Sequence, residues 1–416
     1  MLNNRGGRLR SEHAWWLLRN GLGDSSRRVD HDFDCDVAII GAGITGALVA
    51  QALAEDGHEV VVLDRRDRAL GSTAASTALL QYEIDTQLQD LSIRIGTGRA
   101  RQAYHACVEA IDILDALDER LGRRADFRRC ESIYLASRRW DRSTLIEEMR
   151  LRQESGIHVS FLQREDLMSR YGARRRCALH SPDAAMVDPV RFARQLLEDA
   201  ETRGARTYGN AKVERLEPRT DHVALHLADE HVVRARHVIV CAGYELLPFV
   251  PARVAALHTT FATISEPAVR EMPRRSKAIF WETARPYLYV RETADGRVII
   301  GGQDVPFRSA TIRDALIGRR ARKLVRQYAK LFGEKLRPAY AWAGHFADTA
   351  DGLPCIGSWP GGPERIIYAL CFGGNGIVYA AQAREMIRTR LQGERHPLDD
   401  VFGFERLGNA GSRRGR

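Results

Sequence analysis

Three glycines near the amino end of the chain have the spacing of a phosphate-binding turn. Gly41, Gly43 and Gly46 follow the apolar run VAII and precede a predicted helix. In such a motif the first glycine permits a tight turn, the second lets backbone amides approach a pyrophosphate, and the third lets the helix pack closely on the strand. Asp64 ends the next apolar run, 23 residues after Gly41. A carboxylate there accepts hydrogen bonds from ribose hydroxyls and repels a 2′-phosphate, so the pattern predicts a dinucleotide site that disfavours NADP.

A second glycine cluster lies in the last third of the chain. Gly373, Gly374 and Gly376 flank Asn375 and open a predicted helix that runs to about Leu391. The positive end of a helix dipole would neutralise the charge that a reduced flavin accumulates near N1 and the C2 carbonyl. NAD and FAD share the first motif, and this second cluster favours FAD. A plain glycine-rich turn before a C-terminal helix is the alternative interpretation.

Hydrophobic periodicity predicts the helices that must support these turns. Apolar residues recur at steps of three and four between Gln89 and Gly122, which predicts one long amphipathic helix there. Asp188 and Pro189 are typical of an N-cap followed by proline at the first helical position, in a helix that should end near Gly204.

Alternating patterns predict strands in two further stretches. These are residues 211–243 and residues 287–301, the second with a hairpin turn at Asp295 and Gly296. The residues before the first strand form a predicted arm that packs through Trp15 and Trp16.

Composition excludes several classes of protein. The 416 residues are 44% hydrophobic, enough for a sizeable core in two intertwined domains. The net charge of +9 comes from scattered arginines, so we expect no nucleic-acid partner. The seven cysteines contain no C-x-x-C pair, which favours reduced thiols in a cytoplasmic protein, and no metal site is predicted. The apolar run at residues 14–18 is too short to span a membrane.

The sequence resembles the D-amino-acid oxidase superfamily of FAD-dependent oxidoreductases, which includes glycine oxidase, sarcosine oxidase and gamma-glutamylputrescine oxidase. Beyond the first glycine turn, the resemblance rests on three segments in family order. These are GSTAAST from Gly71 to Thr77, ARHVIVCAG from Ala235 to Gly243, and TADGLPCIG from Thr349 to Gly357. The resemblance extends from about Cys35 to Gly393.

The resemblance implies an α/β fold with a discontinuous Rossmann-type FAD-binding domain and an α+β substrate domain built on an antiparallel sheet. The implied segments are an N-terminal arm at 1–30, an FAD-binding domain at 31–95, 175–250 and 340–395, a substrate domain at 96–174 and 251–339, and a C-terminal tail at 396–416.

The resemblance also implies which residues contact the cofactor. Asp64 would hold the adenosine ribose, and Val213 would pair its backbone with the adenine. The full implied set is Gly41, Gly43, Ile44, Thr45, Gly46, Asp64, Arg65, Ser72, Thr73, Ala75, Ser76, Thr77, Val213, Ala242, Gly243, Gly373, Gly374, Asn375, Gly376 and Ile377. Sarcosine oxidase-like relatives tether FAD through a cysteine where this chain has Gly344, so we expect non-covalent FAD. A covalent link through Cys355 or Cys371, which lie close by in the sequence, stays open as the alternative.

The implied reaction is transfer of a hydride from a carbon that bears nitrogen to flavin N5, giving an imine that water hydrolyses. The protein must then hold the donor carbon near N5, exclude water and keep the amine unprotonated. O2 or another electron acceptor would reoxidise the flavin, and the sequence does not separate an oxidase from a dehydrogenase.

The implied substrate wall departs from that of the amino-acid oxidases. Glycine oxidase-like relatives present an arginine to the substrate carboxylate where this chain has Phe346. A small-molecule amine or N-substituted amino compound is therefore the expected substrate. A glycine-type or D-amino-acid oxidase stays open as the alternative, because Arg285 or Arg291 could replace the missing arginine.

Four residues are our candidates for the catalytic pocket. They are Tyr287, Tyr289, His345 and Phe346. Alternation puts both tyrosines on one side of a strand, where aromatic rings could enclose an amine, and a histidine could accept its proton. Asp348 could instead attract a distal ammonium. The same tyrosines and histidine could equally be packing residues.

Two other classes of function stay open. An NAD-dependent dehydrogenase would explain the first glycine turn but not the second glycine cluster. An accessory flavoprotein subunit that passes electrons to a partner would share every FAD motif and lack turnover.

Overall fold

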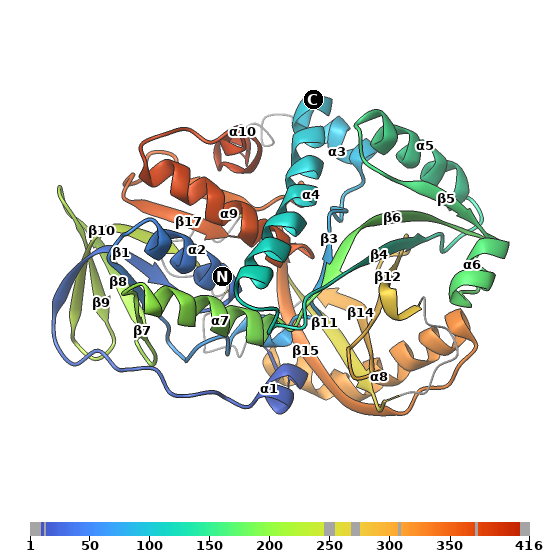
Figure 1. Cartoon of the computed structure of the whole chain (residues 1–416), viewed down its shortest axis with the longest axis horizontal. Helices are drawn as coiled ribbons and strands as arrows, with labels where there is room; N and C mark the ends of the chain where they lie inside the picture. Colours follow the sequence, from blue (N-terminus) through green and yellow to red (C-terminus); the bar gives the residue numbers. More distant parts are fainter. Residues whose placement is uncertain are drawn as a thin grey trace.

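The structure is a computed structural model of the chain. It describes residues 10–11, 14–244, 254–267, 275–306, 309–370 and 373–407. The elements form two sheets with helices packed on them, one sheet at the left of Figure 1 and the other at the right.

The first sheet has eight strands and contains the first glycine turn. Its main path runs β16-β17-β10-β1-β2-β7, with β8 and β9 joined as a hairpin beside β10. Strands β17, β10, β1, β2 and β7 are mutually parallel. The bounds are β1 Phe33–Ile40, β2 Val60–Leu63, β7 Arg206–Tyr208, β8 Val213–Pro218, β9 Val223–Leu227, β10 Val232–Val240, β16 Cys355–Ser358 and β17 Ile366–Leu370.

The second sheet has nine strands and is mostly antiparallel. Its path runs β15-β11-β14-β13-β12-β4-β6-β3, with β5 paired to β6, and only β12 and β4 are parallel among its described pairs. The bounds are β3 Leu79–Gln81, β4 Arg128–Leu135, β5 Ser160–Gln163, β6 Cys177–Met186, β11 Ala256–Ser265, β12 Ala278–Glu282, β13 Leu288–Glu292, β14 Val298–Pro306 and β15 Pro338–Asp348.

The helices divide between the two sheets. Helix α8 packs on β11, β14 and β15, while α2, α4, α7 and α9 pack on one another beside the parallel sheet. Their bounds are α1 Trp15–Asn20, α2 Ile44–Glu55, α3 Leu88–Ile95, α4 Thr97–Arg120, α5 Asp141–Glu154, α6 Arg164–Tyr171, α7 Pro189–Thr202, α8 Ala310–Phe332, α9 Gly376–Leu391 and α10 Asp399–Phe402, with short 3₁₀ turns η1 Ser72–Ala75 and η2 Arg275–Lys277.

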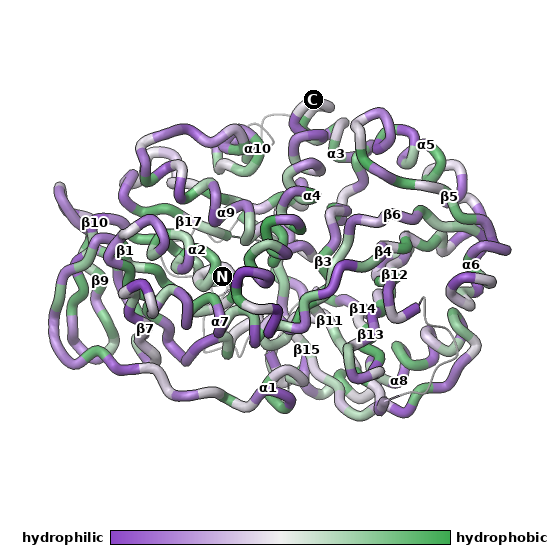
Figure 2. The backbone as a smooth tube through the Cα atoms, in the orientation of Figure 1, coloured by the Kyte–Doolittle hydropathy of each residue, from purple (hydrophilic) through white to green (hydrophobic). Residues whose placement is uncertain are grey.

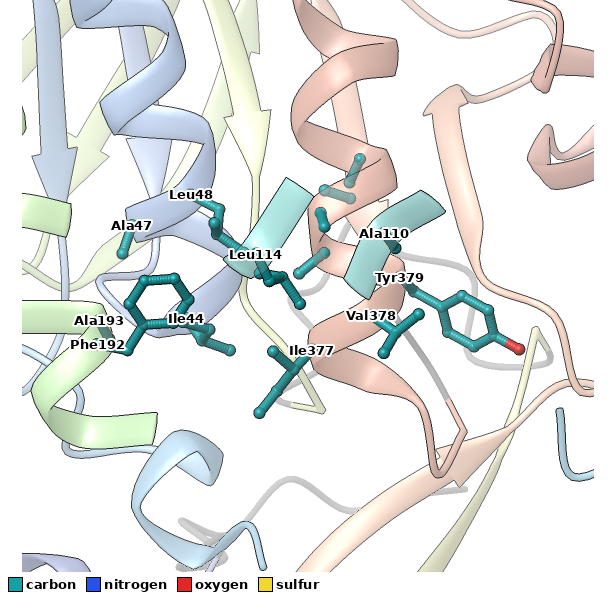
Figure 3. Close-up of a cluster of buried hydrophobic side chains, with 14 of the residues drawn as sticks. Ile44, Ala47, Leu48, Ala110, Leu114, Phe192, Ala193, Ile377, Val378 and Tyr379 are labelled. Carbon is teal, nitrogen blue, oxygen red and sulfur yellow. The ribbon is translucent and has the colours of Figure 1, made fainter. Parts of the chain in front are cut away.

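The largest core lies where α2, α4, α7 and α9 meet. Figure 3 shows Leu48 of α2, Leu114 of α4, Phe192 of α7 and Ile377 of α9 turned toward this space, and all four are buried. Figure 2 shows hydrophobic stretches along the inner strands and α2, with hydrophilic residues at the periphery, as in α6. Within the described residues, no helix combines the length and apolar character needed to cross a membrane.

The long helix predicted between Gln89 and Gly122 is wrong in one respect. Two helices, α3 and α4, occupy this stretch, and the chain turns between them at Gly96, whose φ is 91°. A residue with that φ cannot continue a right-handed helix, and glycine adopts it without strain. The predicted apolar face is present in α4, where Tyr104, Ile111 and Leu114 are fully buried.

The other local predictions are confirmed. The Asp188 carboxylate accepts hydrogen bonds from the backbone N–H groups of Val190 and Arg191 at the start of α7. The predicted hairpin joins β13 to β14 with Gly296 at a φ of 75°. Trp16 of the N-terminal arm is fully buried.

Three strands from the segments predicted to form the FAD-binding domain lie in the nine-stranded sheet and not in the eight-stranded one. Strands β3, β6 and β15 come from segments assigned to the FAD-binding domain but pair within the nine-stranded sheet. These segments therefore pass from one sheet to the other, and the loops that follow them lie at the junction.

The first glycine turn is packed against neighbouring backbone. A Cβ added to Gly46 would lie 1.8 Å from the Gly41 carbonyl oxygen, and one added to Gly41 would lie 2.5 Å from the Cys241 carbonyl oxygen. Real Cβ atoms do not approach backbone oxygen so closely, so only glycine lets α2 start directly behind β1.

We predict that Gly46→Ala lowers the free energy of unfolding by about 2–4 kcal/mol, because the added methyl group must push α2 away from the turn. Urea denaturation measures the change. Gly98→Ala is the matched control, because a Cβ at that position in α4 meets nothing within 4 Å. It should raise the free energy of unfolding by about 0.5–1 kcal/mol. Equal destabilisation by both substitutions would contradict the packing argument.

Candidate active site

The acid predicted to hold a ribose lies at the first glycine turn. The Asp64 carboxylate accepts hydrogen bonds from the backbone N–H groups of Ala42 and Arg66, each at 2.7 Å. Burial raises the pKa of Asp64, and the two N–H groups oppose that rise. The carboxylate thus links the turn to the loop after β2, and the predicted ribose contact stays a prediction.

The small-residue loop after β2 faces the start of α2. The Thr73 hydroxyl accepts a hydrogen bond of 2.9 Å from the backbone N–H of Ile44, at the first turn of α2. The Ser72 hydroxyl is buried and has no hydrogen-bond partner among the described residues. A buried hydroxyl beside a helix N-terminus suits a phosphate oxygen, so this loop fits the pyrophosphate part of FAD.

The second glycine cluster is tied to the end of β3. The Asn375 side-chain amide donates to the carbonyl oxygens of Gln81 and Glu83 at 3.1 and 2.8 Å. The Gly373 N–H donates to the Ala347 carbonyl at 2.7 Å, so the end of β15 is held there too. Helix α9 begins at Gly376, as predicted. The cluster follows β17 of the eight-stranded sheet in the chain and is hydrogen-bonded to β3 and β15 of the nine-stranded sheet, so it presents a helix N-terminus where the two sheets meet.

A cavity of about 750 Å³ adjoins the second glycine cluster. A Cβ added to Gly374 would lie 2.8 Å from a carboxylate oxygen of Asp85 and 3.3 Å from the Tyr287 hydroxyl. The cavity is lined by Asp85, Thr86, Gln87, Asp90, Arg94, Tyr134, Asp141, Thr144, Leu145, His258, Thr283, Arg285, Pro286, Tyr287, Asp304, Phe346, Asp348, Thr349 and Gly352. Five of these residues are aspartates, so the cavity is acidic.

Two of the carboxyl groups titrate near neutrality. Burial raises the pKa of Asp348 to about 7, repulsion from Asp85 and Asp304 adds to this, and Arg285 opposes it. Burial likewise raises the pKa of Asp304 to about 6. The His258 imidazole lies 3.8 Å from the Asp348 carboxylate, and burial lowers its pKa. A cation in this cavity would stabilise the ionised form of both carboxyl groups.

The arginine nearest these carboxylates is already engaged. Arg285 donates to the Asp85 backbone carbonyl, approaches its carboxylate at 3.4 Å, and lies over the Tyr287 ring at 4.7 Å. Arg291, the other candidate for binding a substrate carboxylate, is 3% exposed and donates to the carbonyl oxygens of Ala78 and Val187. Only Arg285 of the two lines the cavity.

Both predicted tyrosines lie on the cavity side of the nine-stranded sheet. The Tyr287 hydroxyl donates to the Asp85 carboxylate at 3.0 Å, and the ring centroids of Tyr287 and Tyr289 are 5.6 Å apart. The Tyr289 hydroxyl lies 3.1 Å from the Thr260 hydroxyl on β11. Phe346 lines the cavity and stacks on His258 at 5.4 Å. The structure thus brings three of the four candidates together.

The fourth candidate, His345, lies on the opposite face of β15. Its ring nitrogens contact the Thr259 hydroxyl at 3.2 Å and the Arg313 guanidinium of α8 at 3.0 Å, and the residue is 5% exposed. Successive side chains of a strand point to opposite faces, so His345 and Phe346 cannot share the cavity. We therefore withdraw His345 as a catalytic candidate and assign it to packing beneath α8.

The remaining predicted residues lie along the carboxyl end of the parallel sheet or near it. Ala242 and Gly243 follow β10, and Val213 begins β8. Cys355 is buried in the core of the eight-stranded sheet, and burial raises the pKa of its thiol. Cys371 lies outside the described residues. Thr45 and Ile377 occupy the first turns of α2 and α9, whereas Arg65 follows Asp64 in the loop after β2.

Sequence reasoning missed four of the five aspartates that line the acidic cavity, namely Asp85, Asp90, Asp141 and Asp304. Asp85 lies after β3 and Asp304 near the end of β14, and neither belongs to a motif with a fixed spacing. Asp304 follows the predicted strand 287–301 by three residues, a signal too common to single it out, and no strand was predicted before Asp85.

Comparison with known proteins agrees with this geometry. The family described as "DAO: FAD dependent oxidoreductase" matches residues 36–388. The chain is 24% identical over 385 residues to gamma-glutamylputrescine oxidoreductase of Escherichia coli (strain K12), covering 89% of this chain and 87% of that protein.

Two solved structures share the fold. Glycine oxidase from Geobacillus kaustophilus has a TM-score of 0.73 at 19% identity, covering 88% of this chain and 98% of that chain. L-proline dehydrogenase from P. horikoshii has a TM-score of 0.73 at 17% identity, covering 92% of this chain and 99% of that chain. The family match spans most of the chain and both predicted glycine turns, and the chain therefore belongs to the DAO family of FAD-dependent oxidoreductases.

Proposed function

We propose that this enzyme oxidises a C–N bond of a cationic amine or N-substituted amino compound. One observation carries the proposal: the cavity beside the second glycine cluster is lined by Asp85, Asp304 and Asp348, and of its two arginines Arg285 is engaged by Asp85 while Arg94 donates to the Ala350 carbonyl. An ammonium group would be attracted there, whereas the carboxylate of an α-amino acid would be repelled.

Bound FAD supplies the hydride acceptor of this reaction, flavin N5. The side chains of the cavity have the other tasks. Asp348 has a pKa of about 7, so its ionised form can take a proton from an incoming ammonium near neutral pH. The amine lone pair that this frees forms the C=N bond as the hydride leaves the neighbouring carbon. Water then hydrolyses the imine to a carbonyl compound and an amine.

Aromatic side chains close the cavity against bulk water. Tyr287 and Phe346 line the cavity, with Phe346 stacked on His258 at 5.4 Å, and Tyr289 packs on Tyr287 with the ring centroids 5.6 Å apart. Burial raises the pKa of both tyrosines, so their hydroxyls stay protonated and act as hydrogen-bond donors. Their role is to orient the amine and exclude water, not to exchange its proton.

We also propose that FAD is held without a covalent link. A Cβ added to Gly344 would lie 2.9 Å from the Ala75 Cβ, so a cysteine at this position would displace η1. Cys355 belongs to the opposite side of the parallel sheet, among Val240, Ile366 and Leu370 in its core. Acid precipitation followed by measurement of free and protein-bound flavin tests this proposal.

The substrate class is tested by anaerobic reduction of the purified holoprotein. We expect primary and N-alkyl amines to bleach the flavin absorbance, and glycine and D-alanine to react at least about tenfold more slowly, which corresponds to about 1.4 kcal/mol of lost transition-state binding. Faster bleaching by the amino acids would overturn the amine proposal and favour a carboxylate site at Arg285. Absence of bleaching with every compound would favour an accessory electron-transfer subunit.

The charge of Asp348 should control cation binding. Because its pKa is raised to about 7, the carboxyl group is ionised in roughly one molecule in ten at pH 6 and nine in ten at pH 8. We predict that tetramethylammonium, which cannot lose a proton, binds the oxidised holoprotein about tenfold more tightly at pH 8 than at pH 6. Perturbation of the flavin spectrum measures the dissociation constant.

Asp348→Asn should remove most of this pH dependence and leave a smaller rise near pH 6 from Asp304, whose pKa is about 6. Asp90→Asn is the matched control, because Asp90 is an exposed carboxylate of the same cavity, and it should keep the wild-type profile. A flat wild-type profile would show that Asp348 does not face the bound cation.

A further inference from the structure

The N-terminal arm lies outside the residues that match the family, yet it contacts the loop predicted to hold FAD. The family match begins at residue 36. Helix α1, at the bottom of Figure 1, lies beside η1, α7 and β15. We call residues 70–78, which contain η1, the cofactor loop.

Two side chains of the arm bind backbone carbonyls of the cofactor loop. The Arg10 guanidinium donates from Nε to the Leu70 carbonyl at 2.9 Å, and the Trp16 indole donates to the Ser76 carbonyl at 2.7 Å. Thr73 of the same loop faces the first glycine turn, as described above. The arm thus binds the cofactor loop before η1, at Leu70, and directly after it, at Ser76.

The nine-stranded sheet binds two further carbonyls of the loop. Trp342 donates its indole N–H to the Ala75 carbonyl at 2.9 Å, and Arg291 donates to the Ala78 carbonyl at 2.6 Å. The Arg291 guanidinium also lies 5.3 Å from the centroid of the Trp16 ring. Four carbonyl groups of the loop are therefore fixed by side-chain donors, two of which come from the arm.

The arm is itself anchored to β15. The Ser11 N–H donates to the Ala343 carbonyl at 3.0 Å, and the Ala343 N–H donates to the Ser11 hydroxyl at 3.1 Å. Arg10 forms an antiparallel bridge with Gly344, the residue that touches Ala75. A displacement of the arm would consequently remove two of the four side-chain donors to the loop, together with the hydrogen bonds between Ser11 and Ala343 of β15.

We propose that residues 10–11 and 14–20 act as a strap that holds the cofactor loop in its FAD-binding conformation, with Arg10 and Trp16 as positioning residues. Docking of the strap and binding of FAD are then coupled, and each favours the other by the same factor. The strap is a property of this chain's N-terminal segment and does not depend on which amine is oxidised.

The charges around the loop support this coupling. Burial lowers the pKa of Arg10 to about 10, with repulsion from Arg66 adding to the effect, and burial lowers the pKa of Arg65 to about 10 with a contribution from the same Arg66. Grouped guanidinium groups repel one another, and the two negative charges of a pyrophosphate would relieve that repulsion. Bound FAD should therefore favour the docked arm.

The proposal is tested by Trp16→Phe, which removes the donor to Ser76 and keeps an aromatic ring. Loss of one such hydrogen bond should raise the dissociation constant of FAD about fivefold to tenfold. Release of FAD from diluted holoprotein, followed by flavin fluorescence, measures this constant.

Trp15→Phe is the matched control. The Trp15 indole N–H is buried but makes no hydrogen bond with the described residues, and its ring packs on Tyr340 and Arg297. This variant should leave the dissociation constant of FAD within twofold of wild type. An equal effect of the two substitutions, or a Trp16→Phe protein that loses stability without FAD yet binds FAD normally, would overturn the strap and leave a purely structural arm.

Hydrogen exchange of the wild-type protein tests the same coupling without a substitution, so its result does not depend on whether a variant folds. Hydrogen exchange of residues 10–11 and 14–20 should slow at least tenfold when FAD saturates the protein, following the FAD binding curve. Exchange that is unchanged by FAD would overturn the coupling. Neither experiment uses a substrate, so failure of the strap and failure of the proposed amine oxidation are separate results.

Discussion

The two sheets depend on one close contact, where Gly344 of β15 meets Ala75 of η1. A single added carbon on Gly344 would lie 2.9 Å from the Ala75 Cβ, so no side chain fits between them. The Trp342 indole fixes the Ala75 carbonyl from the same strand, two residues earlier. This contact sets the distance between the parallel sheet, which supplies the first glycine turn, and the antiparallel sheet, which supplies the cavity wall.

The acidic cavity opposes stability. Burying Asp304 and Asp348 raises their pKa values, which means that their ionised forms are disfavoured in the folded chain relative to water. Relative to the ionised carboxylates, the protonated carboxyl groups stabilise the folded chain. This stabilisation is fully present below the ordinary aspartate pKa and is lost as the pH rises through about 6 for Asp304 and about 7 for Asp348. Groups that weaken the fold at neutral pH in a cavity beside a cofactor site are typical of functional sites. The proposed cationic substrate would offset this penalty on binding.

Local motifs could be predicted from the sequence, whereas the face of a strand that meets the cavity could not. The turn at Gly41 to Gly46, the N-cap at Asp188 and the β13–β14 hairpin follow from residues close together in the chain. His345 was misplaced because alternation gives the relative faces of neighbouring residues but not which face meets the cavity. The break at Gly96 was missed because the apolar period continues across it. Asp85 and Asp304 join the cavity through sheet pairing between distant segments, which no local pattern records.

Charge is distributed unevenly between the two parts of the site. The guanidinium groups of Arg65 and Arg66 lie by the first glycine turn, while carboxylates gather by the second glycine cluster. An anionic cofactor and a cationic substrate are thereby directed to different ends of one site. Under the proposed reaction, the carbon that carried the ammonium becomes part of an uncharged carbonyl compound. That carbonyl product no longer has the charge that Asp304 and Asp348 attract, so the electrostatics that favour entry of the substrate do not retain it, whereas the nitrogen leaves as a second, cationic product.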